Sequence, residues 1–214
     1  MPTSFIPYFY PLIFQNILVG MLVSFVGSLP LGVQNLTALK LTLEKNFRAA
    51  LAFAAACASV EIIYSYLAVK LTQILLRNAM LRLAFQGISI VLFLVVGILY
   101  LIRKPSPQAA AGRRAPFALG LAISLPNMAA IPFWLFYSTF LSGNGWIEIG
   151  YEAGLAAFVL GIPFGTVLAL SLYAALSEQL NRRFSLQQLP VNKIIGVVLI
   201  GLGVYGAVRM VLEI

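Results

Sequence analysis

Long apolar segments separated by short polar ones run through nearly the whole chain. A helix rises 1.5 Å per residue, so about 20 apolar residues cross the roughly 30 Å of hydrocarbon in a bilayer. Hydrocarbon offers no water to backbone groups, so a spanning segment there must be a helix or part of a closed barrel. We therefore expect an all-α polytopic membrane protein. Its six transmembrane helices are predicted at residues 13–30, 49–69, 83–102, 117–141, 153–176 and 194–212.

The composition agrees with a membrane protein and excludes several other classes. Of the residues, 61% are hydrophobic and 9% are charged, whereas soluble domains carry about 25% charged residues. The net charge of +8 is typical of basic cytoplasmic loops, so no nucleic-acid partner is expected. The single cysteine, Cys57, excludes an intramolecular disulfide and a dithiol relay, and there is no histidine. We accordingly expect no metal site and no cofactor.

One short motif occurs twice. Ser28-Leu29-Pro30 is repeated at Ser124-Leu125-Pro126, and the offset of 96 (126 − 30) is close to half of the 214 residues. Proline lacks the N–H that a helix interior needs, and its ring clashes with the preceding turn. Both spans should break at the motif. A broken helix in a bilayer is tolerated only where it is buried in protein or lines a wet cavity.

These breaks predict two inverted three-helix repeats, residues 1–102 and 117–214, with Pro-broken helices one and four. The basic, proline-rich segment 103–116 would link them. Because each half has three helices, the second half enters the membrane from the opposite side. Helices interrupted at matching places in inverted halves are typical of a secondary transporter whose site lies at the midplane.

The charges also predict an orientation. Basic residues concentrate in three loops on one side, which the positive-inside rule places in the cytoplasm, with both termini outside. Residues 70–82, which hold Lys70, Arg77 and Arg82, are the exception. They are expected to form a basic loop on the outer side or an interfacial amphipathic segment. The cytoplasmic set is Lys40, Lys45, Arg48, Arg103, Lys104, Arg113, Arg114, Arg182, Arg183 and Lys193.

Glu61 is the acid that lies deep inside a predicted span, with Tyr64 on the same helical face. A charge at the bilayer centre costs on the order of 3 kcal/mol, so such a residue normally faces the bundle interior or a cavity. Desolvation favours its neutral form. Glu61 is thus a candidate for proton coupling or for binding a substrate ammonium group. The alternative is a structural, neutral side chain that is hydrogen-bonded across the bundle.

Polar, glycine and proline residues around the two breaks are candidates for substrate binding. The amides would bind a carboxylate or amine directly, or they would only satisfy backbone groups that the prolines free. Gly161 and Gly165 are expected to serve packing. Trp134, Tyr137 and Tyr173 could line a pathway, but interfacial anchoring is the default expectation for them. The candidate binding residues are Pro30, Gly32, Gln34, Asn35, Pro126, Asn127 and Pro132, beside Glu61 and Tyr64.

The pattern resembles the LysE/RhtB family of small bacterial amino-acid exporters over nearly the whole chain. Residues 30–35 stand where the family has Pro-Gly-Pro and polar residues, and Val60-Glu61 stands where it has Gly-Asp. Residues 127–132 stand at its Asn-Pro-Lys element without the lysine, and the last span is glycine-rich. The resemblance implies a divergent multi-pass exporter of the bacterial inner membrane, driven by the proton gradient.

The leading interpretation is a transporter that exports an amino acid or related small metabolite by alternating access, with Glu61 changing protonation. A homodimer is compatible with it. The alternative is a non-transporting membrane scaffold that assembles a complex through small-residue helix faces such as that of Gly161 and Gly165. No Ser-His-Asp set and no phosphate-binding loop is present, so we do not expect an enzyme.

Overall fold

The computed structural model describes residues 6–30, 32–76, 79–102, 115–127, 130–179 and 191–212. These residues form helices and contain no strand, which confirms the all-α class. The helices are α1 (Ile6–Ser28), α2 (Val33–Glu44), α3 (Phe47–Leu76), α4 (Ala79–Ile102), α5 (Pro116–Ser124), α6 (Ala130–Gly143), α7 (Glu152–Ala175) and α9 (Val191–Leu212).

Within the described residues, three helices contain a segment long and apolar enough to cross a bilayer, at Pro11–Ser28, Phe47–Ile74 and Glu152–Ala175. Shorter apolar segments occupy Ile90–Ile102 and Gly196–Leu212. The chain is therefore a helical membrane protein. The count of six spans stays a prediction.

The predicted span 13–30 ends at its proline and is followed by a further helix, and the predicted span 117–141 is divided into two helices. Between α1 and α2 lies Pro30, and between α5 and α6 lies Pro126, so the expected breaks at both prolines are confirmed. Pro132 is the third residue of α6. The N–H groups of a first helical turn have no partner within the helix, so a proline there breaks nothing.

Several predicted loops are wrong because helices continue past the apolar segments into charged sequence. Lys40 and Glu44 belong to α2, where their side chains form an ion pair of 3.5 Å, and not to a loop. Residues 70–76 continue α3, and α4 begins at Ala79, so most of the basic loop expected at 70–82 is helical. Long lysine side chains can extend toward water from such helix ends. Residues 103–114 of the predicted linker lie outside the described residues.

The start of the first span also differs from the prediction. Helix α1 begins by Ile6 and not near residue 13, with Pro11 inside it. Pro7 lies in its first turn, where a missing N–H costs no helical hydrogen bond.

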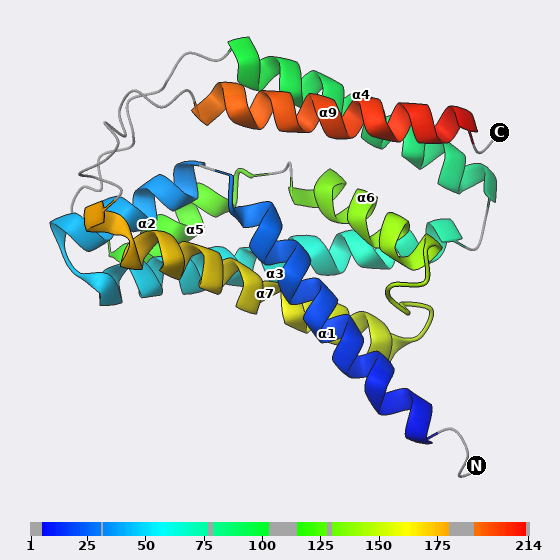
Figure 1. Cartoon of the computed structure of the whole chain (residues 1–214), viewed down its shortest axis with the longest axis horizontal. Coiled ribbons are helices and arrows are strands. Elements are labelled where there is room, and N and C mark those ends of the chain that lie inside the picture. The colour runs from blue at the N-terminus through cyan, green and yellow to red at the C-terminus, as the bar shows by residue number, and fades with distance from the viewer. Residues whose placement is uncertain are drawn as a thin grey trace.

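Each helix packs mainly on a partner from the other half of the chain. Helices α1 and α2 pack on α7, α5 and α6 pack on α3, and α4 packs on α9. In Figure 1, α1 crosses α7 obliquely, and α4 and α9 run antiparallel along one side of the bundle. In the first half, the direction of the chain reverses from α1–α2 to α3 and again from α3 to α4 (Figure 1). In the second half, α5–α6, α7 and α9 also alternate, and each runs opposite to its counterpart in the first half (Figure 1).

Glycines let the backbones of α1 and α7 touch. A Cβ added at Gly161 would lie 2.1 Å from the Ile17 carbonyl oxygen, and one at Gly165 would lie 2.2 Å from that of Met21. Backbone atoms cannot move aside cheaply, so only glycine fits there. The expectation that both glycines serve packing is confirmed.

Two other pairs of helices approach in the same way. A Cβ at Gly120 of α5 would lie 2.6 Å from the Phe53 carbonyl oxygen of α3. Between α4 and α9, Cβ atoms at Gly97 and Gly196 would each meet the other glycine's carbonyl oxygen, at 2.9 and 2.7 Å. The close backbone contacts thus join the two halves pairwise.

We predict that Gly161→Ala and Gly165→Ala each destabilise the protein by about 1–3 kcal/mol, as overpacking does. Gly201→Ala is the matched control, since a Cβ at Gly201 of α9 meets nothing within 4 Å. Thermal unfolding in detergent should show a lower midpoint for the first two variants and no loss for the control. Equal midpoints for all three would contradict the packing described.

Candidate functional site

The two proline breaks lie beside each other. Gln34, in the first turn of α2, donates from Nε2 to the hydroxyl of Ser124, the last residue of α5, at 3.1 Å. This bond joins residues just after the first break and just before the second. Two segments far apart in the sequence, each holding predicted site residues, therefore meet.

Side chains satisfy the carbonyl groups that the first break frees. Carbonyls beyond the last turn of a helix have no N–H from that helix to accept. The Asn35 amide donates to the carbonyls of Ser28 and Pro30, both at 2.8 Å, and the Tyr173 hydroxyl donates to that of Leu29 at 2.5 Å. Asn35 is 3% exposed. Of the two roles considered for it, the contacts show the backbone-satisfying one.

The second break is satisfied in a corresponding way. The Tyr64 hydroxyl of α3 donates to the Leu125 carbonyl, and the backbone N–H of Asn127 donates to the Ser124 carbonyl at 3.0 Å. Leu29 and Leu125 are the middle residues of the two repeated motifs. Each receives a tyrosine hydroxyl from the long helix of the other half, Tyr173 from α7 and Tyr64 from α3.

The other predicted residues take different positions. Gly32 is the N-cap of α2 in an extended conformation, with no side chain capping the helix. Pro126 and the side chain of Asn127 are exposed, and Pro132 is half-buried in α6. These residues border the breaks without converging on one point that the described contacts define.

Glu61 lies where helices of both halves meet. The Thr166 hydroxyl of α7 donates to Glu61 Oε2 on α3, and Thr166 Oγ1 lies 2.8 Å from Ser24 Oγ on α1. Each hydroxyl has one proton to give. When Glu61 is ionised, Thr166 gives its proton to the carboxylate, so Ser24 donates to Thr166. A directed chain of hydrogen bonds therefore runs from α1 through α7 to the carboxylate, through two side chains that are each 1% exposed.

Trp134 of α6 adds a polar group beside the same carboxylate. Its side chain is fully buried, which corrects the prediction that it is an interfacial anchor. The indole interacts with Glu61, but its N–H has no hydrogen-bond partner of ordinary geometry among the described residues. The Glu61 carboxylate is therefore the acceptor that this buried donor faces.

The charge balance limits what this site can hold. The ion pairs of the described residues, Lys40–Glu44 and Lys70–Glu152, do not involve Glu61. No cluster of three His, Cys, Asp or Glu side chains occurs in the described part of the chain. A single carboxylate among two hydroxyls and an indole N–H can take up a proton or pair with a cationic group. Sequence reasoning missed Ser24 and Thr166 as site residues. Only their positions along the helices distinguish them from other small polar residues.

Comparison with known proteins gives a family match. The model of a family described as LysE type translocator matches residues 25–209, which is most of the chain and includes both breaks and Glu61. Neither a curated protein nor a solved structure matches the chain.

We predict that Tyr64→Phe and Tyr173→Phe each destabilise the protein by about 1 kcal/mol, because each leaves a carbonyl at a break without its donor. Tyr66→Phe is the control on α3, since Tyr66 is 44% exposed and its ring, which lies under Lys70, is retained. Thermal unfolding should separate the two variants from the control. Indistinguishable midpoints would show that neither hydroxyl holds its break.

Proposed function

The chain belongs to the LysE type translocator family, and on that premise we propose that it is a secondary transporter exporting an amino acid or a related small metabolite. The observation that supports this best is the position of Glu61. Its carboxylate is linked through Thr166 to Ser24, so one ionisable group in the membrane interior connects α3 of the first half to α7 of the second. A membrane scaffold has no need of such a group.

We further propose that the halves, residues 1–102 and 117–214, are inverted repeats joined through 103–116. Three features support this. The helices of the two halves run in opposite directions in turn (Figure 1). Close glycine contacts pair α1 with α7, α5 with α3, and α4 with α9. The two Ser-Leu-Pro breaks receive their tyrosines reciprocally.

Movement between two bodies would provide alternating access. Backbone contacts at glycines hold α1 to α7 and α5 to α3. The bodies pack on each other along α3 and α7, and side-chain hydrogen bonds also join them, at Gln34–Ser124 near the breaks and at Thr166–Glu61. Such bonds can be exchanged for others without separating packed backbones. The substrate would bind between the breaks, near Gly32, Gln34, Tyr64 and Asn127, where the Gln34–Ser124 hydrogen bond joins the bodies.

Coupling to protons would come from competition at Glu61. The ionised carboxylate accepts from Thr166 and can pair with a substrate ammonium group. Once protonated it can donate, which reverses the hydrogen bond to Thr166 and removes the attraction for a cation. A proton and an amine would then use the carboxylate in turn, which is the requirement for export driven by proton entry.

The scaffold alternative loses its proposed contact surface. Helix α1 of the same chain already covers Gly161 and Gly165, so these glycines are not available to a partner.

We place the multi-pass chain in the bacterial inner membrane, with the linker 103–116 in the cytoplasm and both termini outside. A homodimer stays a prediction.

Counterflow in liposomes tests the proposal. We expect the wild type to exchange a labelled amino acid from a panel and to accumulate it under a pH gradient. Glu61→Gln, which keeps the shape but cannot ionise, should reduce gradient-driven accumulation about tenfold or more, equivalent to about 1.4 kcal/mol. Glu44→Gln is the control, because Glu44 lies in a partly exposed ion pair on α2.

Two results would contradict the proposal in different ways. Full pH-driven accumulation by folded Glu61→Gln would remove the role of Glu61. Absence of exchange with every amino acid, from folded wild-type protein, would remove the substrate class.

A further inference from the structure

The loop between α6 and α7, residues 144–151, folds over one end of the bundle. Its Ile147 and Ile149 are 3% and 0% exposed and belong to the apolar core that contains Trp134 and Phe158. Trp134 in turn interacts with Glu61. At this end, the loop therefore covers the apolar core to which Trp134 also belongs.

One side of the loop is fastened to α1. Asn16, fully buried, donates to the carbonyls of Glu148 and Gly154, both at 2.8 Å, and accepts from the Glu148 N–H at 3.1 Å. Gln15 donates to the Trp146 carbonyl at 3.0 Å. Because glycine contacts also join α1 to α7, the loop, α1 and α7 form one body.

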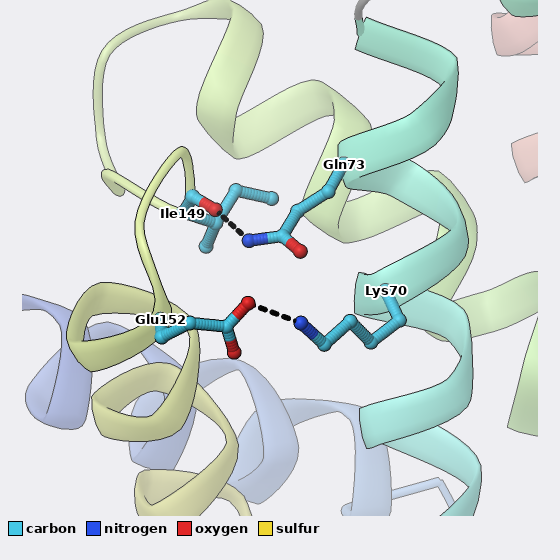
Figure 2. Close-up of polar contacts among 4 residues, drawn as sticks. All are labelled: Lys70, Gln73, Ile149 and Glu152. Carbon is cyan, nitrogen blue, oxygen red and sulfur yellow. Dashed lines mark hydrogen bonds and ion pairs between the residues drawn. The ribbon is translucent and has the colours of Figure 1, made fainter.

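The other side is attached to α3 by two side chains, shown in Figure 2. Lys70 pairs with the carboxylate of Glu152, and Gln73 donates from Nε2 to the Ile149 carbonyl at 2.5 Å. The two residues are three positions apart, so they lie on one face of the helix. The Lys70 and Glu152 side chains are 31% and 77% exposed. An ion pair so open to water contributes little to stability.

The two attachments thus differ in character. Asn16 is buried and has three hydrogen bonds to the loop and the start of α7, and breaking them would leave buried polar groups unpaired. Lys70 and Glu152 would return to water when separated. If the body of α1 and α7 moves against α3, the Lys70–Glu152 ion pair can release without such a cost. Release of the Gln73 contact leaves the carbonyl of the buried residue Ile149 without its donor, so this contact costs more to break.

We propose that these two contacts, Lys70–Glu152 and Gln73–Ile149, form a clasp that closes the outer end of the transport path and releases when the path opens outward. The inference rests on the proposed function. It also accounts for Lys70, a basic residue at the end where the positive-inside rule expects few. The Lys70 ammonium group forms an ion pair with Glu152 at the start of α7.

Reversible cross-linking tests the clasp. In a Cys57→Ser background, Lys70→Cys and Glu152→Cys are joined by a short bis-methanethiosulfonate reagent and released with dithiothreitol. Counterflow should fall about tenfold or more on cross-linking and recover on reduction. The same reagent on either single-cysteine variant should have no comparable effect.

A matched pair on the fixed side of the loop is the control. Gln15→Cys and Trp146→Cys bridge the contact to α1, which does not change in the proposal, so their cross-link should leave counterflow near its reduced value. Unimpaired transport by cross-linked Lys70→Cys/Glu152→Cys would overturn the proposal. Equal inhibition by both cross-links would contradict the inference that the loop releases from α3 and stays attached to α1.

A second measurement needs no solute and separates failure of the clasp from failure of the proposed function. Ala68 is fully buried in the core that contains Ile149, so Ala68→Cys, again with Cys57→Ser, reports water access beneath the loop. Adding Lys70→Ala and Gln73→Ala should raise its rate of labelling by a water-soluble maleimide about fivefold or more. Adding Lys45→Ala instead should not. An unchanged rate would refute the clasp whatever the solute proves to be.

Discussion

The structure depends on one constraint, that every backbone polar group within the hydrocarbon must find its partner inside the protein. The two proline breaks free backbone carbonyl groups from their helical partners, and surrounding side chains donate hydrogen bonds to them. Asn35 and Tyr173 satisfy the carbonyls of the first break, and Tyr64 satisfies one at the second. The tyrosines come from α3 and α7, so the breaks fix how the long helices lie against the broken ones. The meeting point of the halves follows from that arrangement.

Much of this organisation could be predicted from the residues. Proline chemistry located both breaks, because a missing N–H acts locally and needs no tertiary information. Glu61 was identifiable as an interior acid because charge is rare in apolar sequence. The helix ends were predicted less well. Helices α2 and α3 continue into charged sequence, at Lys40–Glu44 and beyond Lys70, since hydropathy marks where lipid ends and not where a helix ends.

The partners of the site residues could not be predicted, for a physical reason. Ser24 and Thr166 matter because α1 crosses α7 at that height and α7 faces α3, and a serine or threonine in an apolar helix has the same local pattern wherever it faces. Trp134 was misplaced for a similar reason. Tryptophan is enriched at interfaces, but here its ring packs edge-to-face on Phe158, with 6.0 Å between ring centroids, inside the core.

The pairing of helices across the halves has a consequence for biogenesis. Membrane helices insert individually and associate afterwards. The glycine surface that receives α1 belongs to α7, which leaves the ribosome only after most of the chain has been made. Until then α1 and the half-helix α2 lack their main neighbour, and the Leu29 carbonyl at the first break lacks its donor, Tyr173. The nascent first half therefore exposes helix surfaces that α7 later covers. The interval before α7 is synthesised is when this protein most needs protection from misassembly.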